Sequence, residues 1–198
     1  MSDLGDSLPL PVRDPEALAR LQRRRSAPAQ SLIAPGPDAG ELAVLLETAA
    51  RTPDHGKLFP WRFVVIEGDA KARLVEQLRP LAREQADAFK AEAVLGKLAN
   101  PPVTVLVVSS PAESRKVPVW EQELSAGAVC MNLEHAAGAL GYSTSWITDW
   151  YAYDARALAL LGLSAQEKVA GFIHIGALAE PPAERPRPDM DAIVSRLA

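Results

Sequence analysis

Three short segments of the sequence carry side chains that could bind an anionic or planar ligand. The first, RRRSAP at residues 23–28, places Arg24, Arg25 and Ser26 in a row at the end of an expected helix. Guanidinium groups bind phosphate through paired hydrogen bonds, and a serine hydroxyl adds another donor. The alternative is that the arginines only balance the negative end of that helix. Taken alone, the segment favours this second interpretation.

The second segment, ARTPDH, ends an expected helix at Arg51 and places His55 in the turn that follows. A buried strand is expected directly after this turn. Loops anchored on rigid elements are where binding groups concentrate. Arg51 could instead serve only the helix end, and a single loop histidine is usually only solvated or hydrogen-bonded. Composition alone leaves the ligand site and the plain connection equally open.

The third segment, STSWITDW, ends an expected strand with Trp146, Ile147 and Thr148. An indole ring beside small hydroxyl groups could pack against a flat heterocycle. Packing into the hydrophobic core is the alternative, and it is the favoured interpretation for the neighbouring Trp150. The segment therefore predicts either a contact to a planar ligand or a core position for Trp146.

The residues needed for classical acid–base or nucleophilic catalysis do not form a recognisable pattern. The three histidines and the single cysteine have neither the order of a catalytic triad nor a zinc spacing: His55, His135, His174 and Cys130. The glycine-rich phosphate loops G-x-G-x-x-G and G-x-x-x-x-G-K-[ST] do not occur. Binding groups without an acid, base or nucleophile suit a protein whose cofactor performs the chemistry. The sequence predicts no catalytic side chain and no metal ligand.

Length and composition indicate one globular domain in a reducing compartment. The chain has 198 residues, 48% hydrophobic and 23% charged, and a formal net charge of -4. This charge argues against general nucleic-acid binding, which needs a basic excess. One cysteine allows no disulfide framework, and no apolar run reaches membrane length. Because the N-terminus also lacks the features of a signal peptide, the protein is expected to be cytoplasmic, without nucleic-acid or membrane partners.

Hydrophobic periodicity and end signals predict an α+β chain without the regular strand–helix alternation of a Rossmann fold. Helices are expected at 14–24, 38–51, 69–99 with a break at Pro80, 119–140 and 154–161, and strands at 62–67, 103–109, 143–148 and 169–178. The apolar run at 62–67 predicts a strand buried on both faces. Residues 1–13 are expected to form a flexible arm, and 14–198 a single domain whose Pro-rich tail, from Glu180, lies extended on a surface.

Four motifs in this order resemble the bacterial nitroreductase family, and within it the short single-domain NAD(P)H nitroreductases. They are RRS, ARTPDHGKLFPWRFVVIEG, KVPVWEQELSAGA and GYSTSWIT, and the resemblance covers about residues 20–178. It implies an α+β fold with a central, mainly antiparallel sheet flanked by helices, in an intertwined homodimer that holds FMN at its interface. In such a dimer the small residues 125–128 would let helices approach closely, and the tail would reach over the partner.

The resemblance also assigns ligands. FMN contacts fall on eight residues of the three segments: Arg24, Arg25, Ser26, Arg51, His55, Trp146, Ile147 and Thr148. The first three of these would bind the phosphate and the ribityl chain. The nicotinamide nucleotide falls on the end of the long helix: Ala136, Ala137, Gly138, Ala139, Leu140 and Gly141. Helix packing followed by a glycine cap is the favoured physical interpretation of that stretch. Thr52 stands where the family commonly has alanine.

The activity that the resemblance implies is a flavin oxidoreductase with NADH or NADPH as reductant. The reductant would pass a hydride to flavin N5 and leave, and a nitroaromatic, quinone or similar acceptor would take its place. Turnover is then ping-pong, and the protein mainly positions the reactants. One alternative is the chemistry of relatives that dehalogenate tyrosines or degrade reduced flavin. Others are a flavin-binding module, sensor or store, without turnover, and a structural α+β protein whose arginines are helix-end cations.

Overall fold

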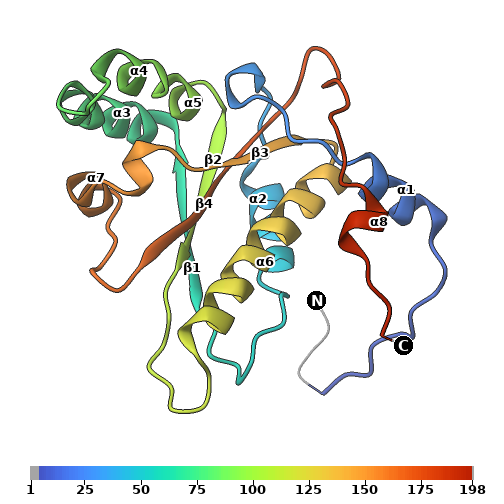
Figure 1. Ribbon diagram of the computed structural model, residues 1–198. Helices are drawn as coiled ribbons and strands as arrows, with labels where there is room; N and C mark the ends of the chain where they lie inside the picture. The colour runs from blue at the N-terminus through green and yellow to red at the C-terminus, as the bar shows by residue number, and fades with distance from the viewer. Residues whose placement is uncertain (1–4, 198) are drawn as a thin grey trace.

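The computed structural model describes residues 5–197, and its centre is a four-stranded antiparallel sheet with the strand order β1-β2-β4-β3 (Figure 1). The strands are β1 Trp61–Glu67, β2 Val103–Ser109, β3 Ser143–Ile147 and β4 Lys168–Gly176. Helices cover both faces of the sheet. The predicted α+β class is therefore confirmed, and each predicted strand is present to within two residues at each end.

Strand β2 is buried along its whole length because it lies between β1 and β4 and is covered on both faces. Its side chains alternate between two hydrophobic clusters, so that Val105 and Val107 face one layer of helices while Leu106 and Val108 face the other. The sequence predicts the same burial for β1, and this prediction is wrong. β1 forms an edge of the sheet, and five of its seven residues are only half-buried.

One face of the sheet is covered by α2 (Ala39–Ala49) and α6 (Val119–Ala139), which lie against each other (Figure 1). Helix α2 begins at a capping box, in which the Asp38 carboxylate accepts from the Glu41 N–H at 2.9 Å and the Glu41 carboxylate accepts from the Asp38 N–H at 3.1 Å. Although α6 has 21 residues, none of the described helices is long and apolar enough to cross a membrane. The candidate site residues are arranged along α6.

The opposite face is covered by α3 (Gly68–Arg83), α4 (Ala88–Ala93), α5 (Gly96–Ala99) and α7 (Ala155–Leu160) (Figure 1). The predicted break at Pro80 is wrong, because α3 continues through this residue. A proline inside a helix costs about 3 kcal/mol. Leu78 and Ala82, on either side of it, are fully buried, and their packing offsets that cost. The helix ends after Arg83, and Asp87 caps α4 through the Lys90 N–H at 3.0 Å.

The N-terminal segment from residue 5 and the C-terminal tail both lie on the α6 side of the molecule (Figure 1). Helix α1 (Pro15–Arg23) begins at the predicted cap Asp14, whose carboxylate accepts from the Ala17 N–H. Residues 5–13 of the predicted arm are exposed and contain no helix or strand, while 1–4 lie outside the described residues. The described part of the tail from Glu180 is mostly exposed and, apart from the short helix α8 (Met190–Ile193), contains no helix or strand. This helix follows the last proline of the chain and begins at the cap Asp189.

His174, on β4, is fully buried in the core. Its Nδ1 shares a hydrogen bond of 2.8 Å with the Thr104 hydroxyl, while its Nε2 has no partner among residues 5–197. Burial, together with the charges of Lys71 and Lys97, lowers the pKa of His174 to about 3. Lys71 is also buried, and this burial lowers its pKa to about 8. Its ammonium group donates to the carbonyls of Pro101 and Pro102.

This buried histidine predicts acid sensitivity. The unfolded chain protonates His174 near pH 6.5, whereas the folded chain stays neutral until about pH 3. Below pH 6.5 the unfolded state binds more protons, so the free energy of unfolding should fall by about 1 kcal/mol per pH unit. Urea denaturation between pH 7 and pH 5 measures this slope. The slope should flatten in His174→Gln and persist in His135→Gln. An unchanged slope in His174→Gln would contradict the prediction.

Candidate functional site

The predicted Arg–Ser segment forms a fixed turn between α1 and the sheet. After α1 ends, the Ala27 N–H donates to the Thr144 carbonyl at 2.9 Å and joins the segment to β3. The Arg24 guanidinium donates to the Ser26 hydroxyl at 3.3 Å, and the Arg25 guanidinium donates to the Ser26 carbonyl at 2.9 Å. The structure therefore brings the three residues of the predicted phosphate site together in one half-buried turn.

Below this turn lies a buried carboxylate that the sequence analysis did not identify. The Glu134 side chain, on α6, is only 2% exposed. It accepts a hydrogen bond from the Thr144 hydroxyl at 2.9 Å, and Arg24 is the cation that faces it, at 3.9 Å. A sequence signal does exist, because Glu134 lies four residues after the core residue Cys130 and three before the core residue Ala137. Charged residues at such core-facing positions of a helix need a partner.

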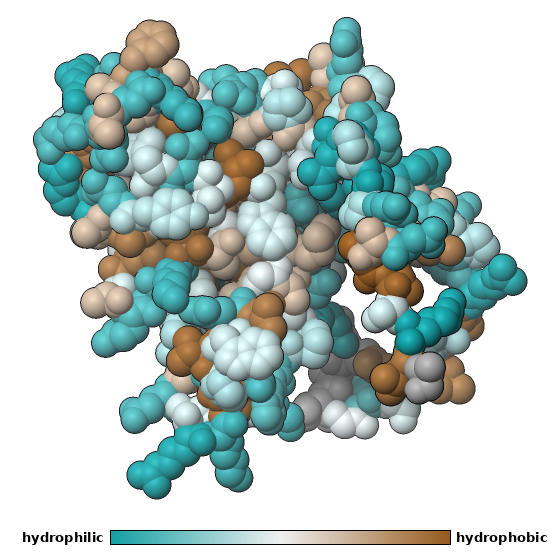
Figure 2. Space-filling view, in the orientation of Figure 1, coloured by the Kyte–Doolittle hydropathy of each residue, from teal (hydrophilic) through white to brown (hydrophobic). Residues whose placement is uncertain are grey.

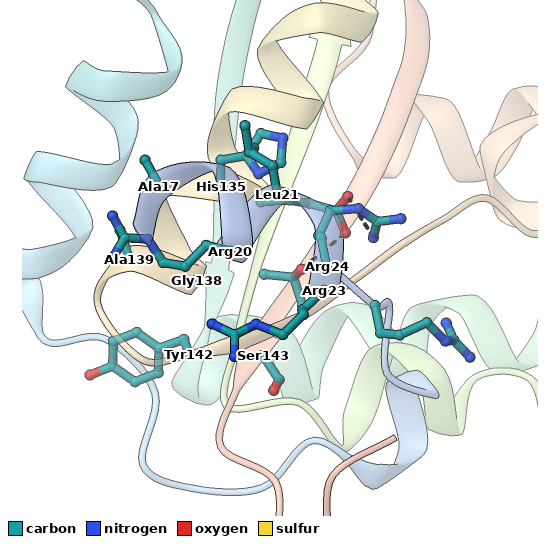
Figure 3. A pocket seen from close by; sticks show the side chains of 13 residues that line it. Ala17, Arg20, Leu21, Arg23, Arg24, His135, Gly138, Ala139, Tyr142 and Ser143 are labelled. Carbon is teal, nitrogen blue, oxygen red and sulfur yellow. Dashed lines mark hydrogen bonds and ion pairs between the residues drawn. The ribbon is translucent and has the colours of Figure 1, made fainter. Parts of the chain in front are cut away.

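A cavity of about 410 Å³ opens between α1, the C-terminal end of α6 and the start of β3 (Figure 3). This volume is within the range of small-molecule sites. Its lining includes four arginines from one short segment, one carboxylate and two aromatic side chains: Arg20, Arg23, Arg24, Arg25, Glu134, His135 and Tyr142. Concentrated positive charge in a chain of net charge -4 indicates an anionic ligand.

The end of α6 is a glycine-capped helix terminus that touches this cavity at two residues. Gly141 has a φ of +88°, and the Gly141 and Tyr142 N–H groups donate to the carbonyls of Gly138 and Ala137, which is the Schellman pattern. Ala137 is buried and Ala136 packs against the same core. The resemblance assigns residues 136–141 to the nicotinamide nucleotide. Two of them, Gly138 and Ala139, line the cavity. Ala136 and Ala137 pack against the core, and Gly141 caps the helix.

The C-terminal tail also reaches the Arg–Ser turn of its own chain. The Arg25 Nε donates to the Ala183 carbonyl at 2.9 Å, and the Arg187 guanidinium donates to the Arg24 carbonyl at 3.1 Å. Glu184 pairs with Arg187 at 2.8 Å and with Arg25 at 4.0 Å. Sequence analysis did not identify these contacts, because the partners are about 160 residues apart and no local pattern connects them.

Arg51 and His55 lie in a different place, beside the N-terminal half of α6. His55 Nδ1 is 2.8 Å from a carboxylate oxygen of Glu121. Thr52 is buried, and its hydroxyl donates to the Ala49 carbonyl and accepts from the Asn132 amide at 2.8 Å. An alanine at position 52, the residue that the family commonly has there, could make neither of these two hydrogen bonds. Neither Arg51 nor His55 lines the cavity, and no described contact joins them to the Arg–Ser turn.

The loop that carries His55 has a constrained shape. Lys57 and Phe59 both have positive φ values, 57° and 50°, which bulky residues rarely adopt. The Asp54 carboxylate holds this conformation by accepting from the N–H groups of Leu58 at 2.8 Å and Phe59 at 3.1 Å. Strained backbone of this kind is concentrated at functional sites, which supports a binding role for the loop.

Trp146 is half-buried at the end of β3 on the α6 side of the sheet. Its indole Nε1 donates to the Ala170 carbonyl at 3.1 Å, and the ring lies so close to Gly171 that a Cβ there would overlap it. Ile147 and Thr148 complete the strand end, both half-buried. The neighbouring Trp150 packs against the other core cluster, as predicted, and donates to the Ala91 carbonyl.

The contact with Gly171 makes a sharp test of the Trp146 position. Gly171→Ala should displace the indole ring and lower the free energy of unfolding by about 1–3 kcal/mol, the usual cost of overpacking. Urea denaturation and the tryptophan emission spectrum measure both effects. Gly96→Ala is the matched control, because its Cβ would meet nothing within 4 Å. Unchanged stability and emission in Gly171→Ala would show that Trp146 has free space around it.

An antiparallel α+β fold with a cationic cavity at one end of its long helix defines a small-molecule-binding protein. Comparison with known proteins makes this more specific, since residues 22–177 match the model of the Nitroreductase family. "Putative NAD(P)H nitroreductase YdjA" of Escherichia coli (strain K12) is 34% identical over 165 residues, which are 81% of this chain and 87% of that protein. The chain belongs to the nitroreductase family.

Solved structures show the same fold. A nitroreductase-like family protein from Bacillus cereus superimposes with a TM-score of 0.81 at 18% identity, covering 95% of this chain and 99% of that one. A nitroreductase with bound FMN from Bacteroides fragilis NCTC 9343 gives a TM-score of 0.73 at 20% identity, covering 93% of this chain and all of that one. The nitroreductase-like fold expected from the sequence motifs is thus confirmed.

Proposed function

We propose that the protein is an FMN-dependent oxidoreductase that takes reducing equivalents from NAD(P)H and passes them to a nitroaromatic, quinone or similar acceptor in a ping-pong reaction. The observation that carries the proposal is the Arg24–Arg25–Ser26 turn, whose two arginines line a cavity in a chain that belongs to the nitroreductase family. A curated relative named for NAD(P)H nitroreduction and a structural relative with bound FMN support it.

The residues present fit a flavin nucleotide. The Arg–Ser turn offers guanidinium and hydroxyl donors, which suit a phosphate dianion. From Thr144, which holds this turn, β3 leads to Trp146, about 7 Å away, and on to Thr148, about 13 Å away, at the rise of a strand. The turn would bind the phosphate, and the segment Trp146–Ile147–Thr148 would contact the ring system. Both of these segments lie on one chain.

The chain's own part in the reaction would be binding and orientation. Bound FMN would supply the hydride chemistry, accepting from NAD(P)H and donating to the acceptor. Cationic groups and hydrogen-bond donors near a flavin favour its reduced, anionic form, and Arg51 and His55 are the described candidates outside the cavity. No triad or metal cluster is needed for this scheme.

A homodimer is part of the proposal, because one chain separates the two predicted groups of FMN ligands. Arg51 and His55 lie outside the cavity that holds Arg24 and its neighbours, so a second copy would have to bring the groups together. Helix α6 has a suitable surface, defined here as the α6 stripe: Trp120, Leu124 and Ala128, all exposed at four-residue spacing. Apolar side chains are visible over the first turns of α6 in Figure 2.

An absorbance spectrum tests the function. The purified protein is mixed with FMN, desalted, and treated with NADH or NADPH without oxygen. A retained flavin spectrum that bleaches would support the proposal. Retained flavin that neither nucleotide bleaches would favour a flavin-binding module without turnover. Complete loss of flavin on desalting would overturn the assignment of Arg24, Arg25 and Ser26 to FMN.

A further inference from the structure

The cavity holds more positive charge than one flavin phosphate requires. We infer that Arg20 and Arg23 form a second anion subsite, which binds the ribose phosphate that distinguishes NADPH from NADH. The inference rests on the proposed function, and it makes NADPH the preferred reductant.

The four arginines of the cavity differ in how their charges are already used. Arg24 faces the buried Glu134 and donates to Ser26. Arg25 donates to two carbonyls and lies 4.0 Å from Glu184. Arg23 uses only its Nε, which donates to the Ala19 carbonyl at 3.2 Å. Within residues 5–197, Arg20 has no hydrogen-bond or ion-pair partner for its side chain. Two guanidinium groups are therefore left for a ligand.

These two groups also have the right placement. Arg20 and Arg23 are three residues apart on α1, a spacing that puts neighbouring side chains on one face of a helix. In Figure 3 both side chains extend toward Ala139 and Tyr142, whereas the Arg24 side chain extends in the opposite direction. Its guanidinium faces Glu134 at 3.9 Å. The cavity is thus divided into the Arg24 part, assigned to FMN, and a second part with its own cations.

A role as helix-end cations explains this arrangement less well. Arginines near the end of α1 do favour its negative terminus, and the Arg23 contact to Ala19 fits that role. The end of α6, however, needs no cation, because the N–H groups of Leu140, Gly141 and Tyr142 already occupy its carbonyls. Arg20 contacts no described carbonyl on either helix. Its charge is available to a ligand.

The rest of the second part suits an adenosine phosphate. The Tyr142 hydroxyl donates to the Glu41 carboxylate at 2.6 Å and to the Gly36 carbonyl at 3.4 Å, which fixes the ring at the cavity wall. A fixed aromatic ring is a stacking surface for a base. A phosphate monoester carries about two negative charges at neutral pH, which matches the two free guanidinium groups. NADH shares the adenine and pyrophosphate but lacks this phosphate.

The test compares nucleotides in the FMN-loaded protein. Flavin bleaching by NADPH should have a lower KM than bleaching by NADH. Arg20→Gln and Arg23→Gln should each raise the KM for NADPH about tenfold or more, as expected for lost charge-assisted hydrogen bonds, and change that for NADH less than threefold. Arg73→Gln, on α3 and away from the cavity, is the matched control and should change neither value.

A binding measurement separates this inference from the proposed function. Calorimetry of adenosine 2′,5′-bisphosphate against AMP reads the subsite without any turnover, and the bisphosphate should lose at least tenfold in affinity in both variants. Equal losses of affinity for the bisphosphate and for AMP, or no loss for either, would overturn the inference. So would a selective loss of FMN relative to riboflavin, because Arg20 and Arg23 would then serve the flavin phosphate. Failure of the wild-type protein to retain FMN would instead overturn the proposed function.

Discussion

Arg24→Ala is expected to weaken FMN binding about 10- to 100-fold and to leave riboflavin binding unchanged. Hydrogen bonds to a charged group contribute about 1.5–3 kcal/mol, and each 1.4 kcal/mol is a factor of ten in affinity. Riboflavin lacks the phosphate, so it isolates the contribution of the guanidinium. Fluorescence quenching of each flavin, titrated with wild type and variant, gives the two dissociation constants.

The matched control is Arg24→Lys, which keeps the charge but loses the forked donor geometry. It should recover part of the FMN affinity. Equal weakening of FMN and riboflavin by Arg24→Ala would mean that Arg24 acts on the shape of the turn. Unchanged FMN affinity would remove Arg24 from the ligand set.

The same substitution should also affect stability through Glu134. Removing Arg24 leaves the buried carboxylate with only the Thr144 hydroxyl. An uncompensated buried acceptor costs about 1–3 kcal/mol, so the free energy of unfolding of the flavin-free protein should fall by that amount. Glu134→Gln in the Arg24→Ala background should recover most of the loss, because an amide oxygen can still accept from Thr144. If the effects of Arg24→Ala and Glu134→Gln on the free energy of unfolding simply add, the two side chains are not energetically coupled and the prediction is wrong.

Much of the fold could be predicted because its signals are local. The capping box at Asp38 and Glu41, the apolar run of β2 and the glycine cap at Gly141 each depend on residues only a few positions apart. The incorrect predictions arose where packing overrides a local rule. Pro80 stays inside α3 because buried neighbours hold the helix, and β1 is half-buried because its place at the sheet edge is a property of topology.

The candidate site was predictable in its residue types and only partly in its arrangement. The Arg–Ser turn forms as one unit because its three residues are adjacent in sequence. Glu134, Tyr142 and Arg187 join it across long sequence separations, and no periodic pattern reports such contacts. The sequence also grouped Arg51 and His55 with the same ligand, whereas one chain keeps them apart. The proposed homodimer would bring the two groups together.

Leu124→Asp is expected to convert a homodimer into a monomer. Leu124 is 62% exposed and lies at the centre of the α6 stripe, between Trp120, which is 60% exposed, and Ala128. Gly127, three residues after Leu124, has open space at its Cβ position, so a helix of a second chain could approach α6 closely there. An aspartate buried at such a contact has no partner to offset its desolvation, which costs several kcal/mol. The dimer dissociation constant should therefore rise at least 100-fold. Analytical ultracentrifugation measures it.

The matched control for this change is Phe89→Asp, which replaces another exposed apolar residue, on α4 in the opposite layer. This substitution should leave the mass of the assembly in solution unchanged. Because Leu124 is exposed in the single chain, the monomer's free energy of unfolding should change by less than about 0.5 kcal/mol. Loss of the dimer should also weaken FMN binding, since Arg51 and His55 would no longer meet the cavity of a second chain. A monomeric wild type would refute the dimer. A monomeric Leu124→Asp that binds FMN normally would show instead that one chain holds the complete flavin site.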